Sequence, residues 1–64
     1  MMYEIDILDG ELVLFDEDGN SYESHRATSY GDAKRTIQRW IERYGFNVAA
    51  AYRLISDHFS QQAV

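Results

Sequence analysis

The chain has 64 residues, with eleven acidic and six basic side chains, and its formal net charge is −5 at pH 7. It contains no cysteine, which excludes disulfides and zinc–thiolate sites. Apolar residues make up 45% of it and aromatic residues 14%, a composition that predicts a folded chain rather than a disordered one. Its length predicts one small domain over residues 1–64. We expect a cytoplasmic protein, because no apolar run approaches the roughly 18 residues of a membrane helix and no signal peptide is visible.

Charge is unevenly distributed along the chain. Residues 1–24 contain eight acids and no base, which gives −8, whereas residues 25–64 contain six bases and three acids, which gives +3. An asymmetry of this kind indicates either pairing between the two halves or a charged partner.

The N-terminal part predicts a three-stranded antiparallel meander. Apolar and acidic residues alternate in the first segment, and Asp9-Gly10 after it is a strong two-residue hairpin pattern. Residues 12–15 are all apolar, which favours a central strand, and Gly19 predicts a second turn before a polar edge strand. The predicted strands are about 2–8, 11–16 and 20–26.

A helix is predicted at about 30–44. Ser29 can cap its first N–H groups, and Asp32 can reach back as in a capping box. Gly45 is expected to end it as a left-handed residue. One apolar stripe follows the helical spacing: Ala33, Ile37, Trp40, Ile41 and Tyr44.

The C-terminal segment allows two interpretations. Asn47 can cap a helix at about 48–61, and the three alanines that follow favour that helix. Apolar residues also alternate with period two over 46–55, which would make a fourth strand. We expect the helix, and therefore an α+β domain in which a three-stranded meander is followed by two helices.

The sequence carries few patterns of catalytic or metal chemistry. The acids of 16–20 resemble a calcium loop, but its sixth and twelfth positions hold Ser21 and Ala27 instead of the required Gly and Glu, which favours a hairpin turn. The histidines, His25 and His58, are expected to be structural. There is no nucleophile elbow and no glycine-rich phosphate loop. We therefore expect no enzyme, no catalytic or metal-binding residue and no cofactor.

The apolar residues predict a core and some exposed aromatic surface. Trp40 lies within the helical stripe and is expected in the core. Five tyrosines are more than one core can hold, so one or two rings should be exposed, where tyrosine favours interfaces. The apolar stripes exceed what one sheet face can cover, and a homodimer is therefore expected at high concentration.

The first candidate interaction surface is basic. Arg35, Arg39 and Arg43 recur every four residues of the predicted helix, where like charges repel one another. Either the acids of the N-terminal segment or an external anion, such as a nucleic-acid backbone, should face them.

The second candidate surface is acidic, and its segment contains no base to relieve the repulsion. Rows of carboxylates on a rigid sheet can stand in for the phosphates of a duplex and occupy a basic groove. The predicted partner-binding residues are Glu4, Asp6, Asp16, Glu17, Asp18 and Glu23.

The small size, the lack of Cys and Pro, the acidity and the meander-plus-helix pattern resemble those of small phage-encoded host-takeover proteins. Anti-CRISPR and anti-restriction inhibitors are the nearest class. The resemblance covers the whole chain and is one of type, with no shared motif. It implies a protein that binds a large defence complex and blocks nucleic-acid access or a moving part.

We therefore expect a non-enzymatic binding protein, an inhibitor or adaptor that docks on a basic, nucleic-acid-binding surface of a partner protein. One alternative is a nucleic-acid-binding protein that uses Arg35, Arg39 and Arg43. Another is a structural subunit completed by homodimerisation. A membrane partner is not expected.

Overall fold

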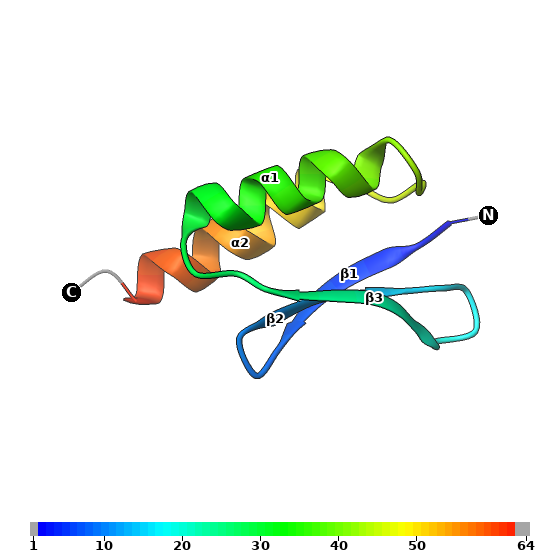
Figure 1. Cartoon of the computed structure of the whole chain (residues 1–64), viewed down its shortest axis with the longest axis horizontal. Helices are drawn as coiled ribbons and strands as arrows, with labels where there is room; N and C mark the ends of the chain where they lie inside the picture. Colours follow the sequence, from blue (N-terminus) through cyan, green and yellow to red (C-terminus); the bar gives the residue numbers. More distant parts are fainter. Residues whose placement is uncertain (1, 63–64) are drawn as a thin grey trace.

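A computed structural model describes residues 2–62, and the side chains of residues 2–60. Three strands are followed by two helices (Figure 1). The elements are β1 (Glu4–Leu8), β2 (Glu11–Phe15), β3 (Ser21–Arg26), α1 (Tyr30–Ile41) and α2 (Val48–Gln62). The sheet is antiparallel with the order β1-β2-β3, so the predicted α+β meander with β2 at its centre is confirmed.

Two tight turns join the strands at the predicted places. Asp9 and Gly10 have φ of 52° and 79°, the left-handed pair that a two-residue hairpin requires. In the second turn Gly19 has φ of 84°, and its N–H donates to the Asp16 carbonyl at 3.1 Å. The register between β2 and β3 then shifts, which leaves Tyr22 as the extra residue of a β-bulge.

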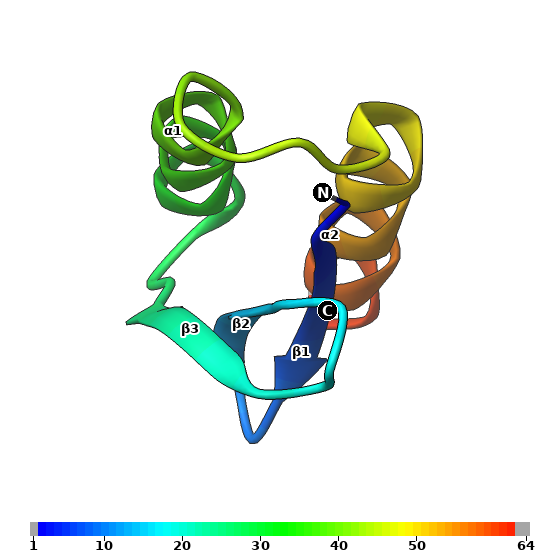
Figure 2. The same ribbon diagram turned by 90° about the vertical axis from the view of Figure 1, so that its right-hand side faces the viewer.

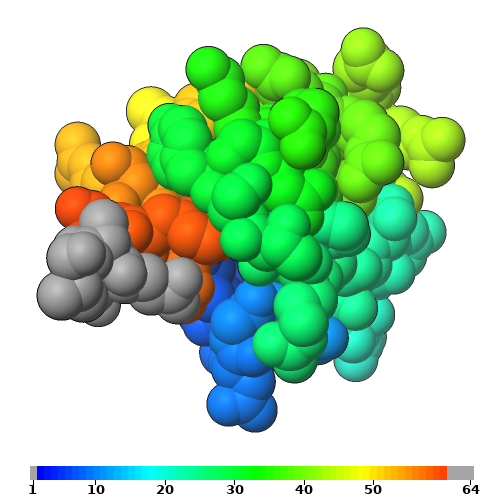
Figure 3. Space-filling view, turned by 60° about the vertical axis from the view of Figure 1, so that its left-hand side comes forward, coloured from blue at the N-terminus to red at the C-terminus, as the bar shows by residue number. Residues whose placement is uncertain are grey.

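Both helices cover the same face of the sheet, so each strand has one face toward the core and one open face (Figures 1 and 2). On β1, Ile5 and Ile7 pack against the core, whereas Glu4 and Asp6 are exposed. The space-filling view shows α1 resting directly on β3, with the β1–β2 turn projecting below (Figure 3). The buried apolar core is Leu12, Leu14, Ala33, Ile37, Trp40, Ala51 and Ile55.

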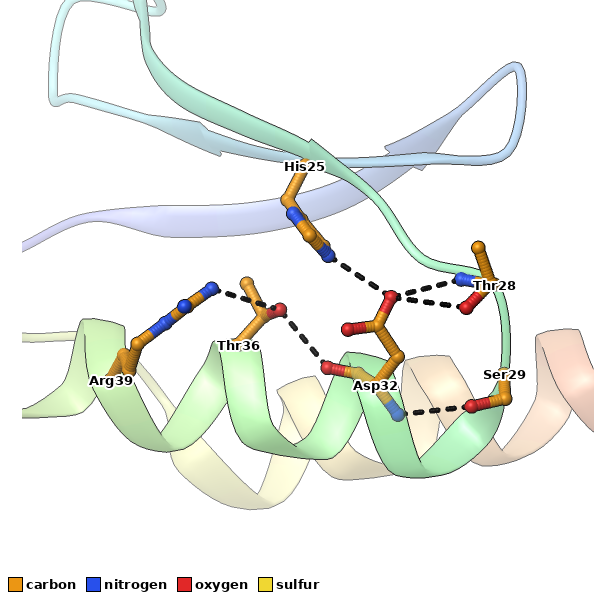
Figure 4. A network of polar contacts seen from close by, with 6 residues as sticks. All are labelled: His25, Thr28, Ser29, Asp32, Thr36 and Arg39. Atoms are coloured by element: carbon orange, nitrogen blue, oxygen red, sulfur yellow. Dashed lines mark hydrogen bonds and ion pairs between the residues drawn. The ribbon is translucent and has the colours of Figure 1, made fainter.

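Asp32 ties the start of α1 to β3 (Figure 4). The Ser29 Oγ accepts the Asp32 N–H at 3.1 Å, which is the predicted helix cap. The Asp32 carboxylate accepts the Thr28 N–H at 3.0 Å and lies 3.1 Å from the His25 Nε2. These contacts, the Thr28 hydrogen bond first and His25 second, lower the pKa of Asp32. One carboxylate therefore links the strand, the connection and the helix.

The predicted end of α1 at residue 44 is wrong. The helix ends at Ile41, because the N–H groups of Arg43 and Tyr44 both donate to the Trp40 carbonyl and close a tight turn. Gly45 does not have a positive φ. The Tyr44 ring packs against tyrosines from the sheet, and this contact favours the early turn over one more helical turn.

The helical interpretation of the C-terminal segment is confirmed, and the alternative strand at 46–55 is wrong. Asn47 caps α2, since its Oδ1 accepts the Ala50 N–H at 3.0 Å and its carbonyl accepts the Ala51 N–H at 3.1 Å. An α-helix satisfies these backbone groups locally, which a strand at this place could not do. Within residues 2–62, neither helix has the length and apolarity to cross a membrane.

Trp40 is only 5% exposed and packs in the core, as predicted. We expect Trp40→Ala to lower the free energy of unfolding by about 3–5 kcal/mol, the usual cost of truncating a buried aromatic side chain. Chemical denaturation followed by circular dichroism measures this loss. Ile41→Ala is the matched control, because Ile41 is 37% exposed and its truncation should cost far less. Equal losses in the two variants would contradict the assigned core.

The lowered pKa of Asp32 predicts that the stability of the fold is sensitive to acid. Its folded-state pKa is lowered, so its contribution to stability is complete above the unfolded pKa near 3.8 and is lost as the pH falls through the folded pKa. Asp32→Asn should therefore destabilise the protein at neutral pH and flatten the acid limb of its stability curve below about pH 4. Urea midpoints between neutral and acidic pH test this, with the exposed Asp57→Asn as control. An unchanged acid limb in Asp32→Asn would contradict the role of this carboxylate.

Candidate functional site

The open face of the sheet presents carboxylates above apolar side chains. Glu4 lies directly across from Phe15 in the β1–β2 register, and Asp6 lies across from Val13. Both acids are exposed, whereas Val13 is only 7% exposed and Phe15 is half-buried. The apolar pair therefore forms a floor beside the exposed acids of β1 on a rigid antiparallel ladder.

The turn between β2 and β3 adds further acids, which have different roles. The Asp16 carboxylate accepts the N–H groups of Asp18 and Asn20 at 2.9 and 3.0 Å, so it stabilises the turn itself. The side chains of Glu17 and Asp18 are exposed. Glu17 also accepts the Met2 N–H at 3.1 Å, which holds the start of the chain against the turn.

The turn and the end of the open face meet around a shallow depression of about 450 Å³. Its lining residues are Met2, Glu4, Phe15, Asp16, Glu17 and Gly19. Glu4 and Glu17 are exposed around this depression, and two further predicted binding residues are exposed close to them in the chain: Asp6 on the same face of β1 and Asp18 in the same turn. We call this region the acidic face and define it by Glu4, Asp6, Glu17 and Asp18.

At the opposite end of the open face, Arg26 offsets part of the acidic charge. Arg26 lies across from Glu11, and the two side chains form an ion pair at 3.8 Å. The same guanidinium donates to the Asp9 carbonyl at 3.1 Å. Negative charge is therefore concentrated at the end of the sheet that carries Glu4 and the acidic turn.

Glu23, also predicted as a binding residue, lies apart from the acidic face. It is paired with Leu14, a core residue, and so points to the helix-covered side of the sheet. Its carboxylate accepts a hydrogen bond from the Tyr44 hydroxyl. That bond first, and partial burial second, raise the pKa of the Tyr44 phenol above its ordinary value.

The predicted basic residues do not form a uniform basic surface. Arg35 and Arg39 lie on α1, whereas Arg43 follows its last residue, and all three are exposed. Arg35 and Arg39 line a depression of about 350 Å³ together with acidic residues. The lining residues of this depression are His25, Asp32, Arg35, Gln38, Arg39 and Glu42. A second depression, of about 510 Å³, is lined by Glu23, Arg39, Trp40, Glu42 and Arg43. In both depressions, carboxylates therefore lie among the arginines and interrupt the positive charge.

The helix arginines do not neutralise the acidic N-terminal segment. Among the side chains that the structure describes, Arg26 forms an ion pair with Glu11, and the His25 ring contacts the Asp32 carboxylate. The Arg39 guanidinium instead donates to the Thr36 hydroxyl on its own helix at 3.5 Å. The carboxylates of the acidic face therefore remain free of basic partners within residues 2–60.

Sequence reasoning missed two parts of this region. The apolar floor depends on the β1–β2 register, for which the Asp9-Gly10 hairpin was an available indication. A cluster of Tyr3, Tyr22 and Tyr44 depends on residues far apart in the chain, and no local pattern predicts it.

Within the described part of the chain, no group of three or more His, Cys, Asp or Glu side chains could hold a metal ion.

Comparison with protein-family models, with curated proteins and with solved structures found no significant match to this chain.

The Tyr44–Glu23 contact makes a testable prediction. Since the Tyr44 pKa is raised, the phenol keeps its proton to higher pH in the folded state, and the resulting stability is complete below the unfolded pKa near 10.0 and is lost as the pH rises through the folded pKa. Glu23→Gln should lower the Tyr44 pKa, because the amide removes the negative charge that opposes the phenolate. Ultraviolet titration of the phenolate band measures the change, and Tyr44→Phe identifies the step. An unaltered high-pH titration in Glu23→Gln would contradict the contact.

Proposed function

We propose that this chain is a non-enzymatic binding protein whose acidic face docks on a basic surface of a partner protein. That basic surface is of the kind that otherwise holds nucleic acid, so the bound protein acts as an inhibitor or adaptor. The docking residues are Glu4, Asp6, Glu17 and Asp18.

The observation that carries this proposal is the unneutralised charge of the acidic face. Like charges gathered on one surface repel one another, and nearby basic side chains would ordinarily relieve this repulsion. Within residues 2–60, Arg26 is the one arginine on the open face, and it is paired with Glu11 at the far end of the sheet. A complementary basic partner would relieve the repulsion instead.

Two further features support a protein partner. Glu4 and Asp6 stand on β1, whose pairing with β2 holds their spacing fixed, and Glu17 and Asp18 lie in the turn that the Asp16 carboxylate stabilises. Met2 and Phe15 lie among them in the same depression, and Met2 is 65% exposed. Apolar side chains surrounded by charge match the usual anatomy of a protein interface, with an apolar centre and a polar rim.

Nucleic acid is the less favoured ligand. Phosphate binding needs a positive field, and the net charge of the chain is −5. A backbone approaching Arg35, Arg39 and Arg43 would also meet the carboxylates of Glu42 and Glu23 in the same depressions.

A matched pair of charge reversals tests the proposal. In one variant Glu4, Asp6, Glu17 and Asp18 become Lys; Asp16 is kept, because its carboxylate holds the turn. In the other variant Arg35, Arg39 and Arg43 become Glu. Each immobilised variant is used to capture basic nucleic-acid-binding proteins, which are then purified for affinity measurements at two salt concentrations.

The acidic-face variant should lose capture while the arginine variant keeps most of it. Association with the unaltered protein should slow as salt rises, because charge complementarity acts mainly on the association rate. Nucleic acid should compete for the captured partner. Loss of binding only in the arginine variant, together with a salt-sensitive gel shift of random DNA, would replace this proposal with direct nucleic-acid binding.

A further inference from the structure

Three tyrosines from distant parts of the chain pack together at the end of the sheet next to the acidic turn. Tyr3 precedes β1, Tyr22 is the extra residue of the β3 bulge, and Tyr44 lies in the connection between the helices. Their ring centroids are 5.0–5.6 Å apart, with interplanar angles between 59° and 78°. These are the tilted and edge-to-face geometries that aromatic pairs prefer.

The cluster is fixed from several sides. The Tyr44 hydroxyl donates to Glu23, and the N–H of Tyr3 donates to the Gly45 carbonyl at 2.6 Å. Tyr22 packs against both other rings, which restricts its rotamers. A ring that is already ordered loses little side-chain entropy when a partner binds.

Tyr22 is nevertheless 57% exposed, in contrast to its two half-buried neighbours. Core packing does not require so large an aromatic ring at a surface position. The β-bulge turns Tyr22 out of the strand ladder, and bulges commonly redirect a side chain in this way. The structure therefore presents one ordered aromatic ring to solvent.

Carboxylates lie beside the tyrosine cluster. Glu23 is the neighbour of Tyr22 in the chain and is bound to Tyr44. Asp16 and Glu17 lie close enough to Tyr3 to help raise the pKa of its phenol, after the larger effects of partial burial and of Tyr22. An aromatic ring beside carboxylates suits a cation that is both planar and able to donate several hydrogen bonds.

We propose that Tyr22 is the anchor for an arginine side chain of the basic partner. The guanidinium stacks on the exposed part of the ring and directs its N–H groups to the neighbouring carboxylates. Arginine fits better than lysine, because its planar guanidinium stacks on aromatic rings and also binds a carboxylate through two parallel hydrogen bonds. This inference rests on the proposed docking of a basic partner and extends it beyond the acidic face, to the end of the sheet.

Two peptides of equal length and charge serve as probes: one alternates glycine with arginine, and the other glycine with lysine. Each is titrated into the protein at low salt while amide and tyrosine ring resonances are followed by NMR. The variants are Tyr22→Ala and Tyr22→Phe. Tyr30→Ala is the matched control, because Tyr30 is also exposed but lies at the start of α1, outside the cluster.

The arginine peptide should bind more tightly than the lysine peptide and shift the Tyr22 ring resonances. Tyr22→Ala should weaken arginine-peptide binding about two- to five-fold, the range expected for an exposed cation–π contact. Tyr22→Phe and Tyr30→Ala should bind like the unaltered protein. Because the ring shifts are measured without any substitution, they test the proposal even if Tyr22→Ala is unstable.

The outcomes separate this inference from the function on which it rests. If the charge-reversed acidic face loses binding of both peptides but Tyr22→Ala does not, the anchor is wrong and the docking proposal stands. Equal binding of the two peptides with silent Tyr22 resonances would likewise overturn the anchor alone. If neither peptide perturbs the acidic face, the docking proposal itself fails.

Discussion

The burial of one face of a three-stranded sheet under two helices is the constraint on which the rest of this structure depends. A strand exposes alternate side chains to opposite faces, so the helices can cover Ile5 and Ile7 only if Glu4 and Asp6 point away. A register slip of one residue would bury both carboxylates without partners. The same apolar contacts that form the core therefore fix the position of the acidic face.

This layering also separates the two kinds of charge. The helices lie on one side of the sheet (Figure 2). The acids of β1 alternate with its core-facing isoleucines and so point to the other side. The arginines of α1 therefore cannot relieve the negative charge of the open face, although the sequence contains enough bases to do so in part. The layer between them keeps both charges exposed, and the acidic surface is the more uniform of the two.

The tyrosine cluster connects these layers at one end of the molecule. It joins the segment before β1, the bulge of β3 and the connection after α1, and the Tyr44 contact with Glu23 gives it a polar attachment. At the start of α1, Asp32 provides a comparable attachment between helix and sheet. Aromatic packing and one carboxylate thus orient the helix pair at its two ends, beside the apolar core that supplies the main stabilisation.

The sequence by itself determined the local features of this protein. Alternation predicted β1, a continuous apolar run predicted β2, and a polar segment predicted the edge strand β3. Asp9-Gly10 and Gly19 predicted the turns, and Ser29 and Asn47 predicted the helix starts, because each depends on backbone preferences within a few residues. Tertiary structure decided where α1 ends, that Glu23 lies apart from the other acids, and that three tyrosines pack together. These features depend on a bulge and on contacts between residues about 20 or more positions apart, for which local propensity carries no information. Basic side chains of the helices can neutralise the acids only if both lie on the same side of the sheet. Which side the helices cover depends on tertiary packing, so the sequence alone could not predict it.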